Sequence, residues 1–117
     1  MSVNPVIGHK ASTFTVTRAS SFVGERPWDA RQIARFADTA VRLHWTDQPY
    51  QWHVNDGQEV FVVLDGLVAM HYRDAQGITQ VVELKAGDIF YAGEGLEHVA
   101  HPCGEARILV IEKLGSI

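Results

Sequence analysis

Residue types that bind metals recur at short spacings in two segments of the chain. The first segment, Tyr50 to Gly66, contains His53, Asn55 and Glu59, and the second, Gly87 to His98, ends on another histidine. An imidazole and a carboxylate on adjacent strands, together with a second imidazole from a later segment of the chain, can form an open site of nitrogen and oxygen ligands for a divalent transition metal. The spacing therefore indicates a metal site, which does not by itself define an activity.

The two segments resemble the paired signatures of the cupin superfamily, written roughly as G-x5-HxH-x3,4-E-x6-G and G-x5-PxG-x2-H-x3-N. The residues that match the family positions are His53, Glu59, Gly66, Gly87, Gly95 and His98. Two motifs in this order and at this spacing are far more specific than either alone, and the resemblance covers roughly the last two thirds of the chain. It implies that His53, Asn55, Glu59 and His98 are metal ligands.

Three positions depart from the family pattern. Asn55 replaces the second histidine, Gly93 replaces the proline, and Pro102 stands where the second motif usually ends in asparagine. Only Asn55 concerns a ligand, and its neutral amide oxygen binds soft divalent metals more weakly than imidazole does. The other ligands still form a set of two histidines and one carboxylate, which is sufficient for iron, manganese, nickel or zinc.

Each ligand also has an ordinary structural interpretation. His53 could be a hydrogen-bonded barrel histidine, Glu59 could pair with an arginine such as Arg42, and His98 could cap a loop. Their occurrence together at family spacing favours one shared site over three unrelated roles. His44 is expected to be an ordinary strand residue, although it could enter the pocket as a hydrogen-bond donor.

The ligands must share one face of their strands. His53 and Asn55 are two residues apart, so their side chains point the same way on a strand. A three-residue loop at 56–58, with Gly57 at positive φ or in a bulge, would set Asn55 opposite Glu59 in a hairpin. On that register Phe61 and Val63 also face inward and form an apolar floor of the pocket.

Short strands broken by turn residues follow Asp38, at the spacing of a barrel or sandwich. In the first of them, apolar residues at 41, 43 and 45 alternate with polar ones. The segment 60–64 is fully apolar and predicts a strand buried on both faces, and a tight hairpin through Asp65 and Gly66 leads into 67–72. Further strands are predicted over 78–84, 89–92 and 106–112. The fold class is therefore all-β, and the resemblance specifies a cupin-type double-stranded β-helix, or jelly-roll barrel, with a short N-terminal helix.

The chain divides into an N-terminal arm at 1–37 and a barrel at 38–117, which together form one structural domain. Alternation at 13–17 predicts a strand in the arm, and small cupins often pair such an arm with a neighbouring subunit. Pro27, followed by apolar residues three apart at 33 and 36, predicts one or two helical turns over 28–36. We expect a homodimer, because the exposed strands of a small barrel must be covered.

Composition restricts the class of protein. The 117 residues are 46% hydrophobic and 21% charged with a net charge of −4, which indicates one globular domain and argues against nucleic-acid binding. No signal peptide or membrane-spanning stretch is evident, and Cys103 has no partner in the chain, so we expect a cytoplasmic protein without disulfides.

The short chain and its ending, Arg107 to Glu112, resemble the small proteins called mannose-6-phosphate isomerase-like cupins. The chain is too short for the extra domain of the larger isomerases, and 50–66 contains no lysine or arginine for a phosphate, so isomerisation is not predicted. The function hypothesis is a divalent-metal site that acts on or binds a small polar organic molecule. The alternatives are a non-catalytic module that binds or senses a small ligand, with or without metal, and a remnant barrel that binds nothing.

Overall fold

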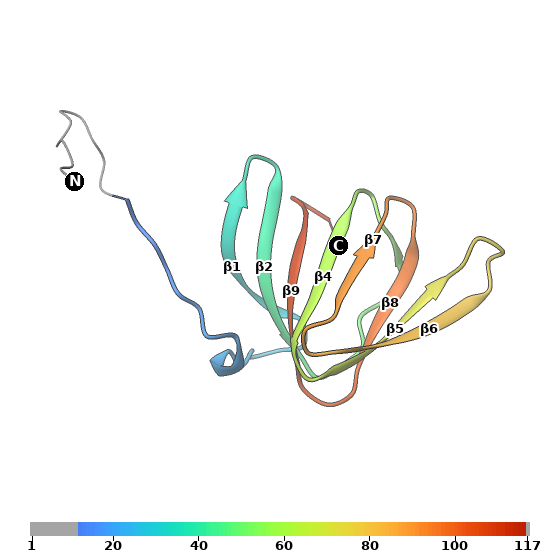
Figure 1. Cartoon of the computed structure of the whole chain (residues 1–117), viewed down its shortest axis with the longest axis horizontal. Coiled ribbons are helices and arrows are strands. Elements are labelled where there is room, and N and C mark those ends of the chain that lie inside the picture. The colour runs from blue at the N-terminus through green and yellow to red at the C-terminus, as the bar shows by residue number, and fades with distance from the viewer. Residues whose placement is uncertain (1–11, 117) are drawn as a thin grey trace, which may run out of the picture.

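The computed structural model describes residues 12–116, which form two antiparallel sheets that face each other (Figure 1). One sheet contains, in spatial order, β1 (Asp29–Phe36), β2 (Thr39–Thr46), β9 (Ala106–Lys113), β4 (Glu59–Asp65) and β7 (Ile89–Ala92). The other contains β3 (His53–Val54), β8 (Glu97–Pro102), β5 (Leu67–Arg73) and β6 (Thr79–Lys85). The all-β jelly-roll prediction is confirmed.

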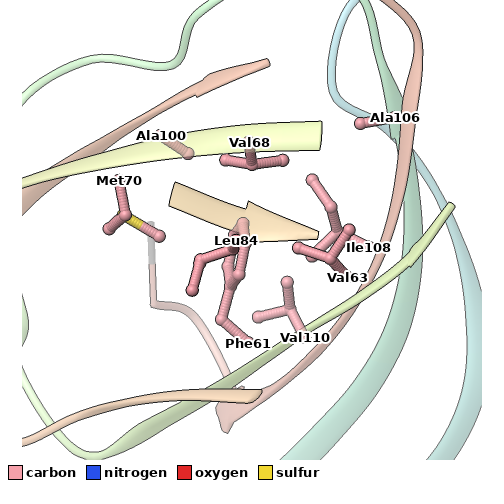
Figure 2. Packing of buried hydrophobic residues seen from close by; sticks show 9 residues of the cluster. All are labelled: Phe61, Val63, Val68, Met70, Leu84, Ala100, Ala106, Ile108 and Val110. Atoms are coloured by element: carbon pink, nitrogen blue, oxygen red, sulfur yellow. The ribbon is translucent and has the colours of Figure 1, made fainter. Parts of the chain in front are cut away.

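The hydrophobic core lies between the two sheets (Figure 2). Its buried side chains come from both inner faces: Phe61, Val63, Ile108 and Val110 from the five-stranded sheet, and Val68, Met70, Leu84 and Ala100 from the other. Burial of each large apolar side chain contributes about 1.5–3 kcal/mol, so this layer holds the sheets together.

Strand β2 turns its polar face toward the interior. Arg42 is the register partner of Val110 and His44 is the partner of Ile108, and both β9 residues belong to the core. Leu43 therefore lies on the outer face of the sheet, where it is 1% exposed and adjoins Thr17 and Ile33. The predicted alternation is present, but its apolar side is the outer one.

The predicted helix over 28–36 is wrong, because 29–36 is strand β1, paired with β2. A register shift between Gln32 and Ala34 leaves Ile33 without a partner in the ladder. Such a bulge shifts the alternation of side chains by one residue, which explains the helix-like spacing of Ile33 and Phe36. One strand of the sheet therefore comes from the segment assigned to the arm.

Both predicted hairpins around β4 are also wrong. Strand β4 pairs with β7 and β9, whereas β5 pairs with β6 and β8, so Asp65 and Gly66 form a corner between sheets. Strand β3 pairs with β8, so 56–58 also links the two sheets and does not set Asn55 opposite Glu59. Strand β4 is not buried on both faces, because Val60 and Val62 are half-buried and Leu64 is 41% exposed.

The described residues of the arm before the first short helix, 12–18, extend outward from the sheets (Figure 1). Residues 12–18 form no strand, and the single short helix of the described residues is a 3-10 turn at Ala19–Ser21. With three residues, that turn is far too short to cross a membrane. The first eleven residues of the predicted arm, and Ile117 at the end of the predicted barrel, lie outside the described part of the chain.

Candidate metal centre

Three of the four predicted ligands meet between the sheets. His53 on β3 and His98 on β8 are register partners, and Glu59 reaches them from β4 in the opposite sheet. One ligand atom from each residue lies within 4.8 Å of the other two. The Nε2 atom of His98 is 3.0 Å from Oε1 of Glu59, and the centroids of the two imidazole rings are 4.3 Å apart. His98 and Glu59 are buried, while His53 is half-buried.

Backbone carbonyls orient both imidazoles in the same way. Nδ1 of His53 lies 3.1 Å from the Gln51 oxygen, and Nδ1 of His98 lies 3.3 Å from the Leu96 oxygen. A ring that donates its Nδ1 hydrogen to a carbonyl presents Nε2 as the ligand atom, which is the usual support for a metal-bound histidine. Two imidazole nitrogens and one carboxylate therefore fit iron, manganese, nickel or zinc.

Asn55 has different contacts from the other three predicted ligands. Its buried amide nitrogen is 3.3 Å from the Ala92 oxygen and 3.4 Å from the Gly93 oxygen. Its backbone N–H donates to Leu96, and its carbonyl accepts from Gly95. Asn55 thus fastens the loop between β7 and β8, which leads directly to His98. Its role as a ligand stays a prediction, and the structure gives its amide nitrogen a structural role.

A cavity of about 240 Å³ opens beside the three ligands. Of the two residues expected to form its floor, Phe61 lines it, whereas Val63 is fully buried in the core and is not part of its wall. The lining also includes residues that the motifs do not contain: Trp28, Arg42, His44, Tyr50, Met70, Ala100, Val110, Glu112 and Ser116. Because β2 turns its polar face inward, Arg42 and His44 reach the cavity. The alternation of polar and apolar residues shows that β2 has one polar face, but not that this face points inward.

A second carboxylate adjoins the ligands. Glu112 on β9 is the register partner of Glu59 on β4, and both side chains line the cavity. Burial, together with the neighbouring Glu59 charge, raises the pKa of Glu112 to about 7. The Arg42 guanidinium lies 4.0 Å from the Glu112 carboxylate. Arg42 therefore pairs with Glu112, and the alternative pairing of Arg42 with Glu59 is not found.

Aromatic residues form the adjoining wall. Trp28 packs edge-on against His44 and Tyr50, and Tyr50 packs edge-on against the ring of His53. Trp28 adopts a left-handed φ of 60°, which is costly for a bulky residue. The indole nitrogen donates to the Gln48 carbonyl at 3.0 Å. Burial lowers the pKa of the His44 imidazole, so the neutral ring is favoured.

Several known structures that resemble this fold are described as cupins. A cupin-2 domain containing protein from Shewanella frigidimarina is 30% identical over 77% of this chain and 84% of its own, with a TM-score of 0.67. A cupin superfamily protein from Desulfitobacterium hafniense is 14% identical over 90% of this chain and 98% of its own, with a TM-score of 0.70. A hydroquinone 1,2-dioxygenase in complex with Fe3+ is 15% identical over 78% of this chain but 29% of its own, with a TM-score of 0.69.

A scan against protein-family models and a search of curated proteins gave no match. The similarity to the Shewanella frigidimarina protein extends over most of both chains. The chain therefore belongs to the cupin superfamily, as a small cupin, and the family predicted from its two motifs is confirmed.

Proposed function

We propose that this cupin holds one divalent transition-metal ion through His53, Glu59 and His98 and uses it to bind or transform a small polar organic molecule. The observation that carries the proposal is the convergence of these three side chains from two sheets, with both imidazoles oriented by carbonyls. A metal held by three side chains keeps coordination positions open for a substrate or other small molecule, which a catalytic metal requires.

The metal would supply a Lewis acid or a redox centre at the wall of the cavity. The protein supplies the surroundings. Glu59 contributes the anionic ligand, and Phe61, Met70 and Val110 provide apolar surface that excludes water. A volume of about 240 Å³ is smaller than the cavities that bind drug-sized molecules, so a compact metabolite fits this site best.

Iron is the first metal to test, because one structural neighbour is a hydroquinone dioxygenase that contains Fe3+. At 15% identity that neighbour supports the fold, and its substrate is not transferred to this chain. The experiment loads the protein with Fe(II), Mn(II), Ni(II) or Zn(II) under controlled oxygen. Oxygen uptake and product formation are then measured with a panel of small hydroxylated and aromatic compounds, with His98→Ala as the control. Metal-dependent turnover that His98→Ala abolishes would establish an enzyme.

The second candidate is a non-catalytic module that binds or senses a small ligand. Asn55 favours it, because this residue stands at a family ligand position and its amide nitrogen is held by two loop carbonyls. A site with fewer strongly coordinating side chains binds metal more weakly. The cavity can then bind a small molecule without metal. Saturable binding without turnover, in both the metal-loaded and the metal-free protein, would identify this function.

Two further parts of the proposal concern assembly and location. Phe14 and Val16 on the extended arm are 87% and 63% exposed, and association with a second copy would cover them, as in a homodimer. Light scattering of the full chain and of a variant that carries Phe14→Ser and Val16→Ser tests this. A cytoplasmic location is compatible with the one exposed cysteine, Cys103, and a fluorescent fusion in the source cell tests it.

A further inference from the structure

Arg42 is a cation that faces the interior of the barrel. It lies in one row across the sheet with Val110 and Phe61, its neighbours in the β2, β9 and β4 register, and all three line the cavity. Its side chain is 28% exposed. A guanidinium placed beside apolar wall residues in a barrel interior has a high cost of desolvation, which an anionic partner would offset.

The partner that the protein itself provides is a weak one. Within residues 12–116 the ion pair of Arg42 is the one to Glu112, at 4.0 Å. Arg107, by contrast, donates to the Phe22 carbonyl at 2.8 Å and to Asp65 at 2.7 Å. Arg73 likewise donates to Glu97 at 2.8 Å and to Thr79 at 2.7 Å. A guanidinium offers five donors in a planar fork, and that of Arg42 has donors left for a planar anion.

Charge balance in the cavity favours an anionic ligand. The two carboxylates that line it, Glu59 and Glu112, together balance a divalent ion held by Glu59 and the histidines. The charge of Arg42 then has no further counterion among the lining residues of the described chain. In the row across the sheet Arg42 is followed by the apolar side chains of Val110 and Phe61, and Met70 adds a further apolar side chain to the cavity lining. A compact molecule with one carboxylate and an apolar or aromatic body matches both features.

We propose that Arg42 is the anion anchor of the cavity and that the ligand of this cupin is a small organic monocarboxylate. The carboxylate binds the Arg42 fork, the apolar body packs on Phe61 and Val110, and the rest of the molecule faces the three metal-binding residues. This inference deepens the proposed function and rests on the same cavity. The unused donors of the Arg42 fork are present with or without metal, whereas the charge balance favours the anion when a metal ion is bound.

The test compares acids with their neutral amides. Benzoate and butyrate are titrated against benzamide and butyramide, at constant ionic strength, into metal-free and zinc-loaded protein by calorimetry. We expect each acid to bind at least tenfold more tightly than its amide, because hydrogen bonds to a charged group are worth more than neutral ones. Arg42→Gln should abolish this preference, and Arg42→Lys, which keeps the charge but not the fork, should retain part of it.

Arg35→Gln is the matched control, because Arg35 is exposed on β1 and donates to the Ala37 carbonyl away from the cavity. It should leave the preference unchanged. If Arg42→Gln does not fold, the NMR signal of the Arg42 Nε–H is measured in the wild-type protein instead. This signal should shift when the acids are added and should not shift when the amides are added. Equal affinity for acids and amides, no binding of either acid, or an unchanged preference in Arg42→Gln would overturn the proposal.

Metal binding and acid binding are measured separately, so the two proposals can fail separately. Arg42→Gln should retain its metal, since Arg42 is not one of the three ligand residues. Wild-type protein that binds no metal but still prefers acids through Arg42 would contradict the proposed function and leave the anchor supported. Protein that binds metal but shows no preference for acids would contradict the anchor and leave the proposed metal site supported.

Discussion

Glu59 and His98 face each other across the gap between the two sheets, with Oε1 and Nε2 3.0 Å apart, and both side chains are buried. In the metal-free protein each group is the hydrogen-bond partner of the other, so neither buried polar group is left unsatisfied. The same two atoms are the ones that would bind a metal. The contact therefore contributes to stability as well as to the candidate site, and the two contributions can be separated by mutation.

His98→Ala and His53→Ala should differ in stability even though both remove a ligand. His98→Ala leaves the Glu59 carboxylate buried without its partner, which should cost about 1–3 kcal/mol in the metal-free protein. His53 is half-buried and donates to a nearby carbonyl, so His53→Ala should cost about 1 kcal/mol or less. Urea unfolding in the presence of a chelator measures both values. Equal losses would show that the buried contact does not stabilise the metal-free fold.

Glu112 should make the metal-free protein less stable as the pH rises. Its folded-state pKa of about 7 is above its ordinary value of 4.5, so the folded protein binds this proton more tightly than the unfolded chain does. The resulting stability is fully present below about pH 4.5 and is lost as the pH rises through about 7, with an upper limit of about 3 kcal/mol. Urea unfolding from pH 4.5 to 8 measures this decline.

Glu112→Gln should flatten the decline with pH, whereas Glu94→Gln, which alters an exposed glutamate, should not. A wild-type slope retained in Glu112→Gln would mean that another group is responsible.

Asn55→Ala should destabilise the fold and leave metal binding intact. The substitution removes the amide that donates to Ala92 and Gly93, and the expected cost is about 1–2 kcal/mol. Gln58→Ala is the control, because its exposed amide donates to the Tyr91 hydroxyl, and it should cost less. Thermal unfolding and metal content are measured for both variants. A tenfold or greater loss of metal affinity in Asn55→Ala alone would show that Asn55 is a ligand, as the family pattern implies.

Gly66→Ala should be more destabilising than Gly77→Ala. Both glycines have positive φ, 87° and 77°, so alanine is strained at each by about 1–2 kcal/mol. A Cβ at Gly66 would in addition overlap the Glu105 carbonyl and lie 3.0 Å from Cα of Ala106, whereas Gly77 has nothing within 4 Å. We expect about 1–3 kcal/mol of further loss at Gly66 in chemical unfolding. Similar losses at both positions would contradict the close packing of this corner.

The structure brings together His53, Glu59 and His98, the three residues that the motif spacing selected, although they come from two different sheets. The hairpin predicted between Asn55 and Glu59 was wrong, since local spacing cannot distinguish a hairpin from a corner that joins two sheets. The helix at 28–36 was wrong for a related reason, because the bulge at Ile33 mimics helical spacing.

The family motifs do not include the β2 residues that line the cavity, so the motifs could not predict them. The usual expectation is that the apolar side of a strand faces the core. On β2 the outer face, with Leu43, is the apolar one, and Arg42 and His44 face inward. Which face of β2 points inward depends on its pairing with β9, more than sixty residues away in sequence, and this long-range register is not visible in local alternation.

The central claim is a metal site shared by two sheets, and elemental mass spectrometry of untagged protein tests it most directly. The wild-type chain is measured beside His53→Ala and His98→Ala, after reconstitution with iron, manganese, nickel or zinc. We predict about one ion per wild-type chain and none in either variant. A wild-type protein without metal after all four reconstitutions, or variants that keep the ion, would contradict the claim.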